Sequence, residues 1–312
     1  MKKILKKIFP IALIITMILL IINSAKCAES FLQGLKLWGL TVLPSTLPFL
    51  FLSNLVSYSV DFNRNVNKKI LGLNPVYIYV FCFSLLSGYP VGAKLTADCY
   101  QNETIDSSQA QTIATLSSVG SATFIVSVVG NCLFFNIKIG IIVYLSHILS
   151  CLICTLIIMN FFKSSYRNNS PVKTEKNGVL YDCVFKSVQT CFIVGGFICI
   201  FSVIIKTFDI IGFFDFFAKI FWFISDKELF KSFLICLVES SNGIKAVSTL
   251  GVNDISVALC SFAISFGGLC VICQSVSFLE KCKIKKGVFI AFKFLHGLLS
   301  FILTLIFLKI LL

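Results

Sequence analysis

The chain has 312 residues, of which 57% are hydrophobic and only 13% are charged, and its mean hydropathy is +0.94. A soluble domain usually carries about 25% charged residues. This composition excludes a soluble globular domain, a disordered chain, a collagen and a disulfide-stapled mini-protein, and it predicts a polytopic membrane protein. Among the 14 cysteines, Cys151 and Cys154 form a CxxC, but they lie inside an apolar run and are typical of small buried hydrophobes. We therefore expect no disulfide framework, no metal site and no cofactor.

The net charge of +13 comes from 27 basic residues against 14 acidic ones. In a soluble protein this excess would indicate nucleic-acid binding, but here the basic residues form short runs between apolar segments. Such runs are typical of cytoplasmic loops. We expect the lipid bilayer as a partner, no nucleic acid, and a cytoplasmic N-terminus. The four runs lie at 2–7, 64–69, 163–176 and 281–286.

Spanning the hydrocarbon core takes roughly 20 apolar residues in a helix. Residues 1–28 are predicted to form a retained N-terminal transmembrane helix, although they also resemble a signal peptide. In the second segment, Pro44 and Pro48 predict a kinked or interrupted helix. The predicted crossings, in chain order, are 8–24, 31–58, 113–132, 138–162, 183–206, 254–279 and 287–312.

Two apolar stretches are too short to span and end in turn residues. Residues 74–86 run into Ser87-Gly88-Tyr89-Pro90, and residues 229–238 run into Glu239 and the sequence SSNG. Both are predicted to be re-entrant hairpins. The Phe-rich stretch 207–228 carries acidic residues and is predicted to be an interfacial helix.

The two halves of the chain align with each other, which indicates an internal duplication. Gly120 matches Gly267 at an offset of 147, and the two hairpin ends match at an offset of 151. We predict a first repeat over 29–162, a cytoplasmic basic linker over 163–180 and a second repeat over 181–312. Each repeat has three crossings, so the repeats are inverted. This all-α architecture, with about seven transmembrane helices and two re-entrant hairpins, is typical of secondary transporters that bind substrate where broken helices meet.

The hairpin ends hold the main candidate site residues. Lys94 and Lys245 each lie two residues after a glycine of a break, Gly92 and Gly243. Helix N-termini and lysines favour anions, so we expect the two lysines to face an anionic small-molecule substrate; the alternative is that each snorkels or caps a helix. The carboxylate of Glu239 is expected to carry a coupling proton or contact substrate, unless it pairs with Lys245 or lies at the interface.

Other candidates are polar groups beside the breaks and small residues that allow close packing. The hydroxyls and amides either bind substrate or cap local turns. His147 and His296 fall on corresponding helices and favour packing over a proton relay. No catalytic motif is present, so we expect a protein that is not an enzyme. The further substrate-binding candidates are Ser87, Gly88, Tyr89, Ser241 and Asn242, and the close-packing or lining candidates are Gly120, Ser121, Gly267, Gly268 and Gln274.

The motifs LLSGYPVGAKLTA, VESSNGIKA and SFGGLCVICQ, with the stretch QNETIDSSQAQTIATLSSVGSATFIVSVVG, resemble the sporulation integral membrane proteins of the YlbJ type. These proteins carry a nucleoside-recognition (Gate) domain, and the resemblance covers most of 30–310. It implies a design related to concentrative nucleoside transporters and movement of dipicolinic acid across the outer forespore membrane, with the cell membrane as the other location. A nucleoside or nucleobase transporter and a non-transporting sporulation scaffold are the alternatives. A coupling H⁺ or Na⁺ and a homo-oligomer are left open.

Overall fold

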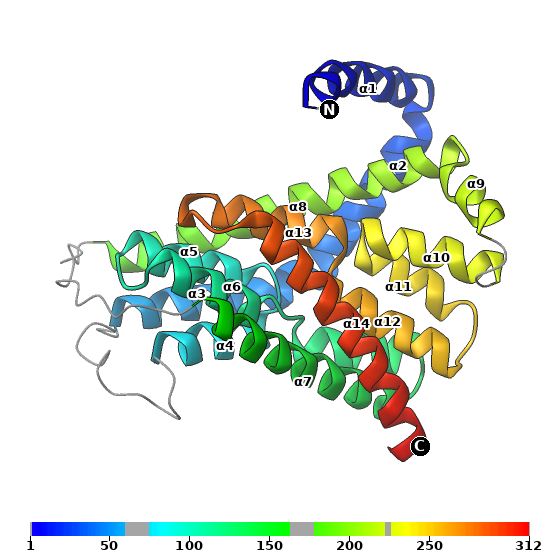
Figure 1. Cartoon of the computed structure of the whole chain (residues 1–312). Coiled ribbons are helices and arrows are strands. Elements are labelled where there is room, and N and C mark those ends of the chain that lie inside the picture. Colours follow the sequence, from blue (N-terminus) through cyan, green and yellow to red (C-terminus); the bar gives the residue numbers. More distant parts are fainter. Residues whose placement is uncertain (1, 60–74, 163–177, 222–225, 312) are drawn as a thin grey trace.

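The computed structural model describes residues 2–59, 75–162, 178–221 and 226–311 (Figure 1). Every regular element in these ranges is a helix. Four helical stretches are long and apolar enough to cross a membrane, and a fifth qualifies if a bent pair near the N-terminus is one span. This confirms an all-helical polytopic protein, while seven crossings stay a prediction. The four stretches are α7 (Ile137–Phe161), α8 (Val179–Ile210), Asp254–Cys282, which contains α12 and α13, and α14 (Lys286–Leu311).

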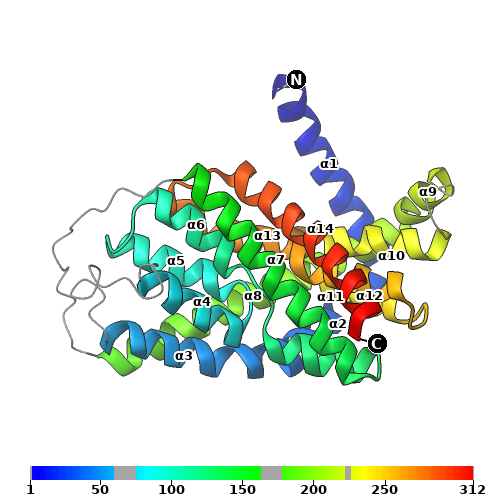
Figure 2. The same ribbon diagram turned by 60° about the horizontal axis from the view of Figure 1, so that its bottom comes forward.

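The N-terminal part of the chain forms one projecting helix and, after a sharp bend, a long interrupted helix. α1 (Lys2–Ile22) is followed by α2 (Ser24–Leu37), and the bend between Leu13–Ile22 and Ser24–Val42 is 98°. α1 projects away from the other helices in Figure 1 and Figure 2, and most of the apolar side chains that the structure describes between Ile11 and Ile22 are exposed, which suits contact with lipid. α2 packs along α8.

The interruption predicted at Pro44 and Pro48 takes the form of a π-helical turn. The turn, Trp38–Val42, joins α2 to α3 (Leu43–Ser59). Proline has no backbone N–H to donate, so the regular ladder of hydrogen bonds is disturbed one turn ahead of it. Pro48 is accommodated inside α3.

Two helical hairpins break where the sequence predicts. The first joins α4 (Pro75–Ser87) to α5 (Val91–Gln101), and the second joins α10 (Lys227–Val238) to α11 (Ser240–Ser248). Gly88 has φ +79°, a conformation that L side chains rarely adopt. That these hairpins are re-entrant stays a prediction.

The helix predicted over 113–132 is interrupted, and its crossing of the membrane stays a prediction. α6 (Ser107–Ser117) ends, residues 118–121 are not helical, and a π-helical segment follows over Thr123–Leu133. The freed backbone groups are satisfied by buried side chains of α7 and α14 rather than by the helix itself. A second break at Gly267 (φ +84°) separates α12 (Asp254–Phe266) from α13 (Gly268–Leu279).

The interfacial helix predicted over 207–228 is shorter in the structure. α8 extends to Ile210, and α9 is Phe213–Ile220, so 207–210 belong to α8. Asp215 of α9 accepts a hydrogen bond from Lys231, and this bond lowers the pKa of the Asp215 carboxyl. The linker predicted over 163–180 lies mostly outside the described residues.

One order of elements occurs twice along the chain: a hairpin, an interrupted helix and a long helix. α4–α5, α6 with its π-helical continuation, and α7 come first; α10–α11, α12–α13 and α14 follow. α14 packs against both α12 and α7, and α13 packs against α5. The centre of the protein is therefore built from both halves of the chain.

Candidate functional site

A cavity of about 120 Å³ lies where the helix breaks meet. Its wall brings together residues from both hairpin breaks, both interrupted helices, the π-helical turn at Trp38–Val42, α3 and α8. Predicted site residues in this wall are Ser87, Gly88, Tyr89, Gly120, Ser121, Glu239, Ser241 and Gln274. Residues that sequence reasoning missed include Thr41, Val42, Thr46, Thr123, Phe124, Val194, Ile198 and Cys270.

Glu239 lies at the break of the second hairpin and is 2% exposed. One carboxylate oxygen accepts the backbone N–H of Ser241 at 2.9 Å and the other accepts that of Asn242 at 2.7 Å. The side chain therefore caps α11, whose N-terminal dipole favours its negative charge. The alternative that Glu239 pairs with Lys245 is wrong, because Lys245 lies exposed on α11 and forms no ion pair within the described residues.

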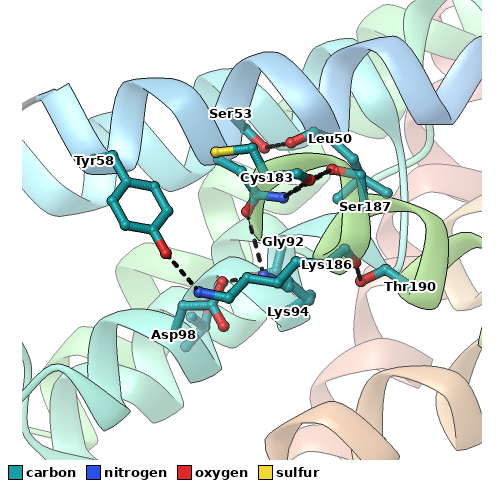
Figure 3. A network of polar contacts seen from close by, with 12 residues as sticks. Leu50, Ser53, Tyr58, Gly92, Lys94, Asp98, Cys183, Lys186, Ser187 and Thr190 are labelled. Atoms are coloured by element: carbon teal, nitrogen blue, oxygen red, sulfur yellow. Dashed lines mark hydrogen bonds and ion pairs between the residues drawn. The ribbon is translucent and has the colours of Figure 1, made fainter. Parts of the chain in front are cut away.

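Lys94 does not reach the cavity. It is 7% exposed, forms an ion pair with Asp98 one turn further along α5, and donates a hydrogen bond of 3.3 Å to Asn54 Oδ1 (Figure 3). Asn54 in turn donates to Ser187 Oγ at 2.9 Å. This network ties α5 to α3 and α8.

The prediction that Lys94 and Lys245 face each other across a substrate is therefore wrong. The acidic partner of Lys94 lies four residues away on the same helix, where side chains meet directly, so the ammonium is neutralised locally. Lys245 instead lines a separate polar crevice, together with Asn242.

The predicted glycines serve backbone packing. A Cβ on Gly92 would collide with the Ser117 carbonyl oxygen and with Ser84 Oγ, and one on Gly243 would collide with the backbone of Cys236. Both hairpins thus close through glycine. Gly267 and Gly268 have positive φ values and form the break between α12 and α13.

Ser87 is a free hydroxyl at the cavity. Its Oγ is buried, and it has no hydrogen-bond partner within the described part of the chain. Gln274 donates from Nε2 to Cys270 Sγ at 3.2 Å. Buried polar atoms are normally satisfied, so the Ser87 hydroxyl is available to a bound molecule.

Lys293 of α14 was missed by sequence reasoning. It is 2% exposed, its Nζ donates to the Ser118 carbonyl oxygen at 2.8 Å, and it lies 5.9 Å from the ring centroid of Tyr89, which lines the cavity. No carboxylate of the described residues pairs with it. A lysine inside the last apolar span was the sequence signal for this residue. The nearby basic run at 281–286 obscured it.

The two histidines form a buried pair beside Lys293. Their rings stack with centroids 4.8 Å apart, and His296 Nε2 bonds to the His147 carbonyl oxygen at 2.9 Å. His147 also contacts the first break, because its Nε2 accepts the Gly120 N–H at 2.9 Å. The packed role that the sequence favours fits this geometry, and a relay role stays a prediction. Within the described ranges, no group of three or more His, Cys, Asp or Glu side chains is arranged to hold a metal ion.

The long apolar helices together with the similarity below define an integral, multi-pass membrane protein. The chain is similar to the sporulation integral membrane protein YlbJ of Bacillus subtilis (strain 168), with 27% identity over an alignment that covers 89% of this chain and 76% of the relative. This confirms the predicted YlbJ-type resemblance and supports a membrane protein in sporulation. No family model matches the chain, and no solved structure matches it significantly. The Gate domain stays a prediction.

Proposed function

We propose that the chain is a secondary transporter that moves a small organic anion across a membrane during sporulation. The observation that carries the proposal is the convergence of three helix breaks on one cavity, at the two hairpins and at 118–121, with α13 completing the wall through Cys270. Unsatisfied backbone groups cost several kcal/mol each in hydrocarbon, so such breaks persist where they line a cavity or bind a solute. Broken helices that meet at one site are the usual substrate site of secondary transporters.

The repeated order of hairpin, interrupted helix and long helix supports an inverted-repeat design. The contact of α13 with α5 supports it further, because the interrupted helix of one half then packs on the hairpin of the other. In this design the two hairpins are re-entrant, and alternating access follows from movement of one half against the other.

The uncompensated charge of Lys293 supports an anionic substrate. A buried ammonium without a carboxylate partner is costly even when it donates to a carbonyl oxygen, as Lys293 does, and a carboxylate bound in the adjacent cavity reduces that cost. The free hydroxyl of Ser87 adds a hydrogen-bond donor to the same wall.

Dipicolinic acid is the lead substrate, carried across the outer forespore membrane. Its assignment rests on the YlbJ-type resemblance, and its two carboxylates fit the charge argument above. The protein acts on it without catalysis in this proposal.

A nucleobase is the second candidate. Glu239 and Gln274 line the same cavity, and a carboxylate and an amide suit the donors and acceptors of a neutral heterocycle better than they suit a dianion. The volume disfavours a complete nucleoside, which adds a sugar to the ring.

Ligand-dependent stabilisation separates these functions. A ligand that binds only the folded protein at 100 times its Kd stabilises it by about 2.7 kcal/mol. We expect dipicolinate to raise the Tm of the purified protein and nucleobases to leave it unchanged. The reverse result would replace the lead substrate, and no shift with either, combined with normal spore dipicolinate content in a deletion strain, would favour a non-transporting scaffold.

A further inference from the structure

A polar crevice lies next to the cavity, between α2, α8 and α11. It consists of two neighbouring hollows of about 230 and 370 Å³ that share Gln33, Ser202 and Asn242 in their walls. The larger hollow also shares Ser241 with the cavity at the helix breaks. The first turn of α11 is thus a thin partition, with Glu239 on the cavity side and Asn242 on the crevice side.

The crevice carries an excess of positive charge. Lys36 and Lys245 line the larger hollow, and neither forms an ion pair with a carboxylate of the described residues. Lys206 and Asp209 line the smaller hollow, where Asp209 lies 3.6 Å from Lys206 and 3.5 Å from Lys231, so its charge is already neutralised. Glu29 accepts a hydrogen bond of 3.5 Å from Gln33 Nε2 and lines neither hollow.

We propose that this crevice is the access vestibule through which a small carboxylate reaches the cavity, with Lys36 and Lys245 attracting it electrostatically. The inference rests on the proposed transport function. It gives Lys245 a role at the approach to the site in place of the predicted role inside it. Clefts lined by one sign of charge raise the local concentration of oppositely charged solutes and their association rates by about 10- to 1,000-fold.

Steering of this kind has a kinetic signature that a structural role lacks. Removing the two charges slows association and raises KM, while kcat stays unchanged because the cavity is intact. The effect weakens with added salt, since the Debye length is about 10 Å at 0.1 M ionic strength and about 3 Å at 1 M. Both lysines are exposed, so neutral variants should fold normally.

The test is uptake of radiolabelled dipicolinate into proteoliposomes at about 20 mM and about 500 mM salt. For the double variant Lys36→Gln/Lys245→Gln we expect a KM about ten times that of the wild type at low salt, converging on the wild-type value at high salt. The matched control is Lys281→Gln/Lys283→Gln, which removes two exposed lysines outside the crevice and should leave KM unchanged.

Three results are decisive. A wild-type KM in the crevice variant overturns the vestibule alone, and so does an equal rise in the control variant. A complete lack of uptake by the wild-type protein overturns the proposed function, and the vestibule with it.

Discussion

The backbone N–H of Gly120 donates a hydrogen bond to the ring of His147, with the nitrogens 2.9 Å apart, inside a fully buried region. Because Nε2 accepts this bond, Nδ1 carries the ring hydrogen and donates to Ser265 Oγ at 2.7 Å. Gly120 belongs to the break of the first interrupted helix, and Ser265 lies two residues before the second break at Gly267. One imidazole therefore connects the two interrupted helices.

We predict that His147→Phe destabilises the protein by about 2–6 kcal/mol, because it leaves the Gly120 N–H and the Ser265 hydroxyl without partners at about 1–3 kcal/mol each. Denaturant unfolding in detergent measures this. His147→Gln keeps an acceptor and should cost less, and His296→Phe, which loses one bond, should also cost less. Equal stability of His147→Phe and wild type would show that the bridge contributes nothing.

Lys293 should separate binding from folding. Lys293→Met removes a buried charge that has no carboxylate partner in the described structure, but it also leaves the Ser118 carbonyl oxygen without its donor. We expect the two effects to offset each other and the Tm to stay close to the wild-type value. Dipicolinate affinity should fall at least tenfold, measured by equilibrium binding to the purified protein. Wild-type affinity in this variant would exclude Lys293 from anion recognition.

Lys94 and Asp98 should show the opposite pattern. Lys94→Met leaves the Asp98 carboxylate unpaired, and we expect a loss of about 1–3 kcal/mol, moderated by the partial exposure of Asp98. The double variant Lys94→Met/Asp98→Asn should recover most of that loss in a double-mutant cycle. Additive losses would mean that the two side chains act independently.

Glu239 distinguishes the two candidate substrates. In Glu239→Gln the side chain still caps α11 through one oxygen, but the negative charge facing the cavity is gone. We expect tighter dipicolinate binding, because repulsion of a dianion is removed. A nucleobase that uses the carboxylate as acceptor should bind more weakly to the same variant, and competition binding with both ligands reads out the difference.

Gly92 and Gly243 should not tolerate a side chain. Gly92→Ala and Gly243→Ala place a Cβ against the neighbouring helix of each hairpin, and overpacking of this kind costs about 1–3 kcal/mol or more. Monodisperse yield and Tm in detergent measure the loss. Gly196→Ala in α8 is the control, because no atom lies within 4 Å of its added Cβ. Wild-type behaviour of both hairpin variants would argue against close packing.

The sequence predicted the helix breaks better than the contacts across them. Composition and the turn residues after Ser87 and Val238 placed both hairpin breaks correctly, because glycine and short apolar length are local signals. The partners of Lys94 and Lys293 depend on which helices lie side by side. Asp98 was visible four residues away, but Asn54, forty residues earlier, and the Ser118 carbonyl, 175 residues before Lys293, were not.

The site was predicted in part for the same reason. Residues at the breaks, such as Ser87, Tyr89 and Glu239, converge on the cavity because breaks are where backbone and polar groups gather. Thr41 and Thr46 carry no local signal, since a threonine in an apolar helix is common. Thr41 and Thr46 reach the cavity because the π-helical turn and α3, which carry them, pass beside it.

The π-helical turn at Trp38–Val42 sets the rotation of α3 about the helix axis. Each residue of an α-helix advances about 100° around the axis, and a π-helical turn holds about one residue more than an α-helical turn. Deleting one residue within 38–42 would remove this extra residue and restore a regular helix with α3 close to its present rotation. Winding the same five residues into a regular α-helix would instead rotate α3 by about 100°. Thr46 would then turn away from the cavity and Asn54 away from Lys94 in a single step, so the length of this short turn is as informative as its sequence.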